Sequence, residues 1–184
     1  MSTKKSRGDL HTLQRRMLRA ALLDAELYEE VEADRGANGQ AFAVVVLSAV
    51  AAGVGGLEHH GVWAIFDYTL TALVSWWIWA YVAFLVGTKL LPGPKTQSDP
   101  GELLRTIGFS SAPGTLRIFA LISPIAGLVF LVCTVWMLVT MVVAVRQALD
   151  YSGTGRAIAV CAIGFPIYAA TLALSMLLLG PWPL

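Results

Sequence analysis

Long apolar stretches separated by short polar segments occupy the chain from residue 40 onward. The hydrocarbon core of a bilayer is about 30 Å thick, and a helix of about 20 apolar residues can cross it. The first two stretches, Gln40–Leu57 and Val62–Leu91, have about this length or more. The second is too long for one upright span, so we expect its first turn to lie at the membrane interface. The pattern therefore predicts helices that cross a membrane.

Proline divides the remaining apolar sequence. The stretch Ile107–Gln147 would form one helix roughly 60 Å long, but Ser123-Pro124 lies within it, and proline interrupts helical hydrogen bonding. We therefore expect two spans there. The last stretch, Arg156–Leu179, contains Pro166, which is expected to kink the helix rather than end it. The predicted fold is all-α, a polytopic integral membrane bundle of five transmembrane helices over about 40–57, 64–89, 105–122, 125–148 and 156–179.

The basic residues predict how this bundle is oriented. Twelve of the 13 lysines and arginines lie in 1–39, 89–105 and 146–156, which face the same side when the chain crosses five times. Cytoplasmic loops carry an excess of lysine and arginine, so we expect a cytoplasmic N-terminus and an external C-terminus. A four-span alternative lays 107–122 along the interface and places the C-terminus in the cytoplasm. That alternative leaves two arginines beside an external loop.

Residues 1–39 are predicted to form a cytoplasmic N-terminal amphipathic helix and linker ahead of the membrane domain, 40–184. Between residues 10 and 34, apolar side chains recur at helical spacing on one face and arginines occupy the opposite face. Such a helix can lie on the anionic cytoplasmic leaflet, dock onto a partner protein or cap the bundle. The candidate cytoplasmic contact surface comprises Arg15, Arg16, Arg19, Glu102 and Arg105.

Composition narrows the function classes. Hydrophobic residues make up 57% of the 184 residues and charged residues 14%, and the net charge is +1. Soluble domains have about 25% charged residues, so a soluble enzyme and a basic nucleic-acid binder are excluded. The first residues contain no apolar run of the kind that marks a secretory signal peptide. We expect a multi-pass integral protein of a bacterial inner membrane.

Two charges inside the predicted spans are the main candidates for chemistry, because burying a charge in a membrane costs about 3 kcal/mol or more. They are Asp67 in the second span and Arg117 in the third. The two spans are antiparallel, which brings both residues to a similar depth, so we predict that they pair, with Tyr68 adding a hydrogen bond. The pair would fix the register of the two helices or form a substrate or ion site. Alternatively, Arg117 extends to the outer surface.

The sequence contains no catalytic constellation. A phosphate loop, a nucleophile elbow, an HExxH motif and a dinucleotide fingerprint are all absent. Glu58, His59 and His60 lack a third well-spaced ligand, so no metal or other cofactor is expected. Cys133 and Cys161 lie in apolar stretches, where a free cysteine packs as a small hydrophobic residue. We therefore expect a protein that is not an enzyme.

The segment Glu102–Pro113 reads ELLRTIGFSSAP. It resembles the start of the third span in the Yip (Ypt/Rab-interacting protein) domain family, where a helix reads roughly ELLR-x-x-Gly-aromatic-x-x-Ala-Pro. The order of spans over 40–180 is also similar, and the bacterial branch is closer in style. The resemblance implies five membrane helices with a cytoplasmic N-terminus. Eukaryotic members bind Rab-type small GTPases, but the Asp-Leu-Tyr-Gly-Pro motif is missing here, so small-GTPase binding is doubtful and is not carried over.

Together these patterns predict a non-enzymatic integral membrane protein that organises or partners other membrane components. The expected partners are the lipid bilayer and either other membrane proteins or further copies of the chain. The alternative function is a small oligomeric transporter or channel that uses Asp67 and Arg117.

Overall fold

In the computed structural model, residues 2–57 and 63–179 are described, and all secondary structure assigned within these two ranges is helical. The all-α prediction is therefore confirmed for this part of the chain. The elements are α1 (Ser2–Ala21), α2 (Ala25–Ala33), η1 (Arg35–Ala37), α3 (Asn38–Gly55), α5 (Trp63–Leu85), η2 (Val86–Leu90), α6 (Pro100–Ser110), η3 (Ala112–Leu121), η4 (Ser123–Ile125), α7 (Ala126–Ala148) and α8 (Thr154–Leu179). Among them η2 is a π-helix, and η1, η3 and η4 are 3-10 helices.

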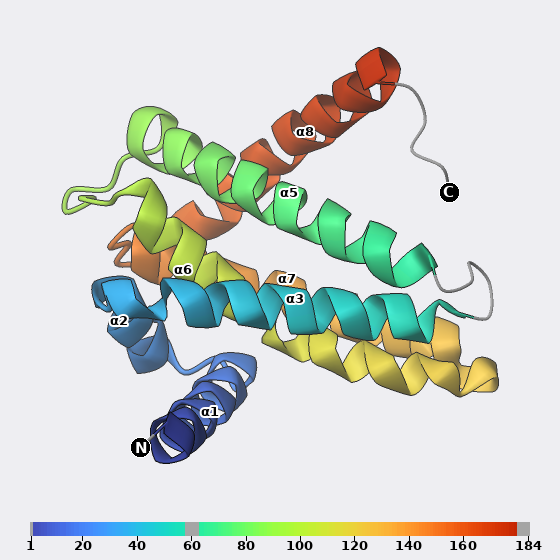
Figure 1. Ribbon diagram of the computed structural model, residues 1–184. Coiled ribbons are helices and arrows are strands. Elements are labelled where there is room, and N and C mark those ends of the chain that lie inside the picture. Colours follow the sequence, from blue (N-terminus) through green and yellow to red (C-terminus); the bar gives the residue numbers. More distant parts are fainter. Residues whose placement is uncertain (1, 58–62, 180–184) are drawn as a thin grey trace.

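The helices that follow α2 form a bundle. Its chain direction alternates over five successive segments: α3, α5 with η2, α6 with η3, α7 and α8 (Figure 1). Within the described residues, Arg35–Gly55, Tyr68–Leu90 and Ala126–Ala148 are long and apolar enough to cross a membrane. These helices correspond to three of the five predicted spans and are compatible with a membrane protein. The final helix, α8, diverges from the bundle toward its C-terminal end (Figure 1).

The third predicted span, over 105–122, is not one continuous α-helix. It consists of α6 and η3, which meet at Ser111, directly before Ala112 and Pro113. Proline cannot donate a backbone hydrogen bond, so the α-helical ladder ends there and a 3-10 helix begins. The Thr140 hydroxyl of α7 donates to the Ser110 carbonyl at 2.8 Å, at the end of α6. Together α6 and η3 extend roughly 36 Å, from rises of about 1.5 and 2.0 Å per residue.

Close helix packing surrounds α3. A Cβ added to Gly55 would lie 2.5 Å from the Arg117 carbonyl oxygen of η3, and one added to Gly108 would lie 2.8 Å from Ala41 Cβ. Larger residues at these two positions would force α3 away from η3 and α6. Small residues on both sides of this contact therefore bring the backbone of α3 next to the broken third helix.

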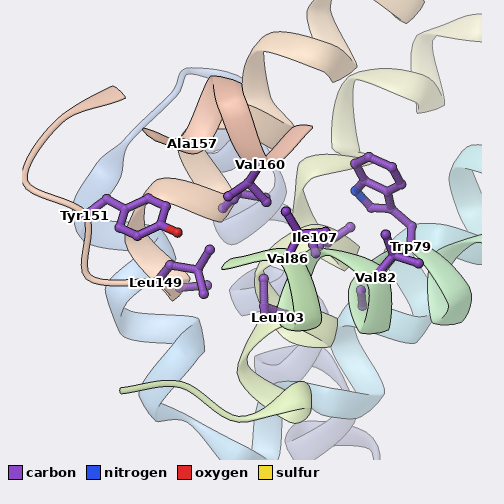
Figure 2. Packing of buried hydrophobic residues seen from close by; sticks show 13 residues of the cluster. Trp79, Val82, Val86, Leu103, Ile107, Leu149, Tyr151, Ala157 and Val160 are labelled. Atoms are coloured by element: carbon purple, nitrogen blue, oxygen red, sulfur yellow. The ribbon is translucent and has the colours of Figure 1, made fainter. Parts of the chain in front are cut away.

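A buried apolar cluster holds together the end of the bundle from which α8 departs. Figure 2 shows side chains of α5, η2, α6 and α8 converging with Leu149 and Tyr151 of the α7–α8 turn. The Tyr151 hydroxyl donates to the carbonyls of Gly87, at 3.1 Å, and Leu91, at 2.6 Å. This turn is thereby fixed against the end of η2, which sets the angle at which α8 leaves the bundle.

The predicted amphipathic helix of the N-terminal region is two helices rather than one. Leu23 has a φ of 63°, a left-handed conformation that ends α1. The Asp24 side chain then accepts a hydrogen bond from the Glu26 N–H at 3.1 Å and caps α2. The apolar periodicity continues through the turn because both helices pack on the same bundle. We call residues 2–33 the N-terminal hairpin.

Candidate functional site

The N-terminal hairpin is closed by ion pairs between its two helices. Arg16 Nη2 lies 2.8 Å from Glu30 Oε1 and 3.0 Å from Asp34 Oδ2. Arg19 Nε lies 2.6 Å from Asp24 Oδ2, and its Nη1 lies 2.7 Å from Glu30 Oε2. The hydrogen bond from Arg16, with a smaller contribution from Arg19, lowers the pKa of the Glu30 carboxyl against the opposing effect of burial. Two arginines of the candidate contact surface thus hold α1 on α2.

Apolar burial fixes the hairpin to the bundle. The α2 side chains of Leu27, Tyr28 and Val31 are fully buried and pack against α6 and α7 through residues such as Phe109. The Tyr28 hydroxyl donates to the Ala20 carbonyl at 3.2 Å, so the buried phenol remains hydrogen-bonded. The hairpin is therefore an integral layer of the fold rather than a tethered tail.

Arg105 is a buried clamp between α6 and the end of α2. Arg105 is only 4% exposed to solvent. Nε donates to the carbonyls of Val31, at 2.9 Å, and Glu32, at 3.1 Å, and Nη1 donates to Asn38 Oδ1 at 3.3 Å. Nη2 also donates to the Glu32 carbonyl. The guanidinium thereby satisfies carbonyls at the C-terminal end of α2, where a positive charge is favourable.

The remaining two members of the candidate contact surface differ from each other. Glu102 forms a capping box with Asp99: the Asp99 N–H donates to Glu102 Oε2 at 2.9 Å, and the Glu102 N–H donates to Asp99 Oδ1 at 3.0 Å. Glu102 therefore starts α6, whereas Arg15 lies exposed on α1. The five residues do not form one exposed basic patch, because Arg105 is buried and the charges of Arg16 and Arg19 are neutralised within the hairpin.

Glu32 sits half-buried beside the Arg105 clamp. Burial, followed by repulsion from Glu102, Asp150 and Glu29, raises the pKa of the Glu32 carboxyl to about 7, and attraction to Arg105 offsets only part of this effect. The junction between the hairpin and the bundle therefore contains a carboxyl group that titrates near neutral pH.

The tip of the hairpin reaches far along α7. Trp136 Nε1 donates to the Ala21 carbonyl at 2.8 Å. Trp136 lies about 18 Å along α7 from the Ala148 end, at 1.5 Å per residue. At this tip Leu18 and Leu22 are 62% and 67% exposed. An exposed apolar tip therefore lies beside the middle of an apolar helix, a placement that the sequence pattern did not indicate.

A second candidate site is a cavity of about 360 Å³ between the helices of the bundle. Its apolar lining comes from α3, α5, α6, α7 and α8: Val45, Ala49, Ala52, Ala72, Trp76, Trp79, Ile107, Met137, Leu138, Met141 and Phe165. Its polar lining residues are Ser48, Tyr68, Ser75, Ser110, Ser111, Arg117 and Thr134. Among the described side chains of this lining, Arg117 is the single charged one, so they combine an apolar surface with one cation.

Arg117 reaches the cavity from η3. Its Nη2 donates to Thr134 Oγ1 at 2.9 Å, and its Cζ lies 5.5 Å from the centre of the Phe130 ring. Its Nε is buried and has no hydrogen-bond partner among the described side chains. The side chain of Asp67 lies outside the described residues, so its ion pair with Arg117 stays a prediction. Tyr68, the expected third member, lines the same cavity.

The other candidate ligands yield no site within the described ranges. Glu58, His59 and His60 lie outside the described residues, and the side chains that the structure describes contain no group of three or more metal ligands. Cys133 is buried, Cys161 is partly buried, and both are free thiols.

Sequence reasoning missed Trp136 and Thr140 as positioning residues. Each donates to a backbone carbonyl at a helix end, at 2.8 Å in both cases. Tryptophan and threonine each carry a hydrogen-bond donor. Their presence within an apolar stretch is therefore a sequence signal that a nearby backbone carbonyl needs such a donor.

Comparisons with protein-family models, curated proteins and solved structures give no match for this chain. The resemblance of Glu102–Pro113 to the Yip family therefore stays a prediction.

Proposed function

We propose that this chain is a non-enzymatic, multi-pass membrane protein that organises or partners other membrane components, and that the tip of the N-terminal hairpin is its contact element. The observation that carries this proposal is the hydrogen bond from Trp136 to the Ala21 carbonyl, 2.8 Å long, which holds the exposed Leu18 and Leu22 beside the middle of α7. If α7 spans the bilayer, this tip lies within the cytoplasmic leaflet. Lipid and neighbouring membrane proteins are its available partners.

The distribution of charge supports five crossings with the hairpin on the cytoplasmic side of the membrane. The end of the bundle that carries α2 also carries the α5–α6 and α7–α8 connections (Figure 1). Lys95 lies in the α5–α6 connection, and Lys89, Arg146 and Arg156 lie in the helix ends next to the two connections. The positive-inside rule assigns such an end to the cytoplasm. We propose a bacterial inner membrane as the location, with α6 and η3 as the third crossing and α8 as the fifth.

Membership of the Yip family is part of the same proposal. Four residues of the resembling segment have structural roles that suit a recurring motif. Glu102 caps α6 and Arg105 clamps α2. Gly108 allows the close approach of α3, and Pro113 follows the break between α6 and η3. None of these roles requires a small GTPase.

A pull-down after mild detergent extraction tests the contact role. Full-length protein is compared with a variant carrying Leu18→Ser and Leu22→Ser at the tip, and with a deletion of residues 1–34. The matched control carries Leu128→Ser and Leu131→Ser, two residues of α7 that are each 62% exposed. We expect the tip variant and the deletion to lose captured membrane proteins or a differently tagged second copy, and the control to retain them. An unchanged set in the tip variant would assign the contacts to another surface.

The cavity favours a second candidate function, a small oligomeric transporter or channel that uses Asp67 and Arg117. The supporting observation is a cationic side chain at a cavity of about 360 Å³ inside an apolar bundle. Flux into proteoliposomes tests it. Transport should fall in Asp67→Asn and Arg117→Gln, and flux unaffected by both substitutions would eliminate this function.

A further inference from the structure

The cavity has the dimensions of a ligand site rather than of a packing defect. Its volume of about 360 Å³ falls in the range of small-molecule pockets, roughly 300–1,000 Å³. An apolar cavity of about 150 Å³ in another protein already accepts a benzene ring. The lining residues Tyr68 and Trp79 lie about 16 Å apart along α5, at 1.5 Å per residue. The space is therefore elongated along the helix.

The two ends of this space differ in chemistry. Trp79, Ile107 and Phe165 supply apolar surface toward one end. Arg117 lies toward the other, where its backbone approaches Gly55 at the end of α3. An extended apolar region that leads to one cation matches a molecule with a hydrocarbon chain and an anionic head. A purely polar solute would leave most of the lining without a partner.

Arg117 has N–H donors that no described residue uses and that are available to an anionic head group. The guanidinium has five N–H donors in a planar fork. Its contacts in the described residues are one hydrogen bond to Thr134, at 2.9 Å, and the Phe130 ring, while the buried Nε has no partner among these residues. Carboxylate and phosphate groups bind this fork with two parallel hydrogen bonds. Because a charge inside a membrane is costly when unpaired, a bound anion would relieve that cost.

The cavity is also accessible from the side of the bundle. Two of its lining residues, Leu138 of α7 and Phe165 of α8, are 47% and 58% exposed. Thr134, which binds Arg117, is exposed as well. A hydrocarbon chain can therefore enter laterally from the bilayer without crossing an aqueous surface.

We infer that this cavity binds an anionic amphiphile, with its hydrocarbon chain along the apolar lining and its carboxylate or phosphate on Arg117. The inference does not rest on the partner role of the N-terminal hairpin. The ligand is either a phospholipid of the surrounding bilayer or a free single-chain amphiphile, since both present the same chemistry.

Quenching of tryptophan fluorescence by brominated chains tests the inference, because Trp76 and Trp79 line the cavity. Purified full-length protein is titrated with a bromododecanoate, and separately with the neutral bromododecanol and a cationic bromododecyl trimethylammonium. We expect saturable quenching by the carboxylate. Its apparent Kd should rise at least tenfold in Arg117→Gln and stay unchanged in Arg146→Gln, a matched control at the other end of the bundle.

A second variant protects the test against misfolding. Ala49→Leu adds volume to the cavity wall without changing charge, and it should weaken binding of the carboxylate and of the neutral alcohol alike. Circular dichroism and gel filtration check that each variant is folded. Equal affinity of Arg117→Gln and wild type for the carboxylate would overturn the inference, and so would equal affinity of the wild type for all three probes.

Nanodiscs distinguish the two sources of the ligand. Stronger quenching by brominated phosphatidylglycerol than by brominated phosphatidylcholine, with the difference lost in Arg117→Gln, would identify a bilayer lipid; the exposed Trp77 is quenched by both. Quenching by the free carboxylate alone would identify a single-chain amphiphile. If the wild type binds neither anion but Asp67→Asn does, the inference is overturned, and Arg117 belongs to the predicted ion pair. None of these outcomes depends on the pull-down that tests the contact role.

Discussion

Replacing Arg105 should release the N-terminal hairpin from the bundle. Arg105 is 4% exposed and donates to the carbonyls of Val31 and Glu32 and to Asn38 Oδ1. In Arg105→Gln the charge is lost, and the carbonyls at the end of α2 lose their donors. A hydrogen bond from a charged group contributes about 1.5–3 kcal/mol, and the favourable interaction with the helix dipole adds about 0.3–1 kcal/mol. The expected loss in the free energy of hairpin docking is therefore about 2–4 kcal/mol.

Hydrogen exchange of the α2 amides measures this docking free energy. A loss of about 2–4 kcal/mol corresponds to exchange roughly 30- to 700-fold faster, at 1.4 kcal/mol per factor of ten. Arg105→Lys should fall between the variant and the wild type, because an ammonium keeps the charge but lacks the planar fork. Arg156→Gln, an exposed arginine near the same end of the bundle, is the matched control. Exchange in Arg105→Gln no faster than in this control would refute the role of the clamp.

Three further predictions concern the same junction and the broken helix. Glu32→Gln should strengthen hairpin docking at pH 7 and above and leave it unchanged at pH 4. The pKa of Glu32 is raised from 4.5 to about 7, so docking is strongest below pH 4.5, weakens as pH rises from there to about 7, and levels off above that. After allowance for solvent screening the gain at pH 8 is about 1 kcal/mol, and equal α2 exchange at pH 8 in variant and wild type would contradict it. Trp136→Phe should make the hairpin turn more sensitive to proteolysis, because the Ala21 carbonyl loses a hydrogen bond that contributes about 1 kcal/mol. An unchanged rate of cleavage would show that apolar packing alone holds the tip. Thr140→Val keeps the side-chain volume but leaves the buried Ser110 carbonyl without the threonine donor. The free energy of unfolding should fall by about 1–3 kcal/mol, which lowers the thermal unfolding temperature. An unchanged temperature would mean that the helix break needs no such donor.

Helix content and the three helices that are long and apolar enough to cross a membrane follow from the sequence, because both depend on local composition and length. The breaks within the apolar stretches are predicted less completely by the sequence. Ser123-Pro124 predicts a break, and η4 lies there, between η3 and α7. Pro113 carries a similar signal, but the apolar run around it predicts one continuous helix over 105–122. An apolar run can continue through a change from α to 3-10 geometry, so periodicity does not reveal it.

Contacts between distant segments explain the remaining differences. Arg105 looked exposed because it follows a polar loop, but α2 covers it through residues more than 70 positions earlier in the chain. Arg117 was identified as an intramembrane charge from its position alone. That it borders a cavity depends on side chains from α3, α5, α6, α7 and α8, and no local pattern encodes their convergence.

The number of membrane crossings can be measured directly by labelling single cysteines in intact cells with a membrane-impermeant maleimide. Cys133 and Cys161 are first replaced by alanine, and one cysteine is then placed after Leu184 or at Lys95 in the α5–α6 connection. With five crossings, we expect the C-terminal cysteine to react in intact cells and the one at Lys95 to react only after permeabilisation. A C-terminal cysteine that reacts only after permeabilisation would contradict five crossings and favour the four-span arrangement.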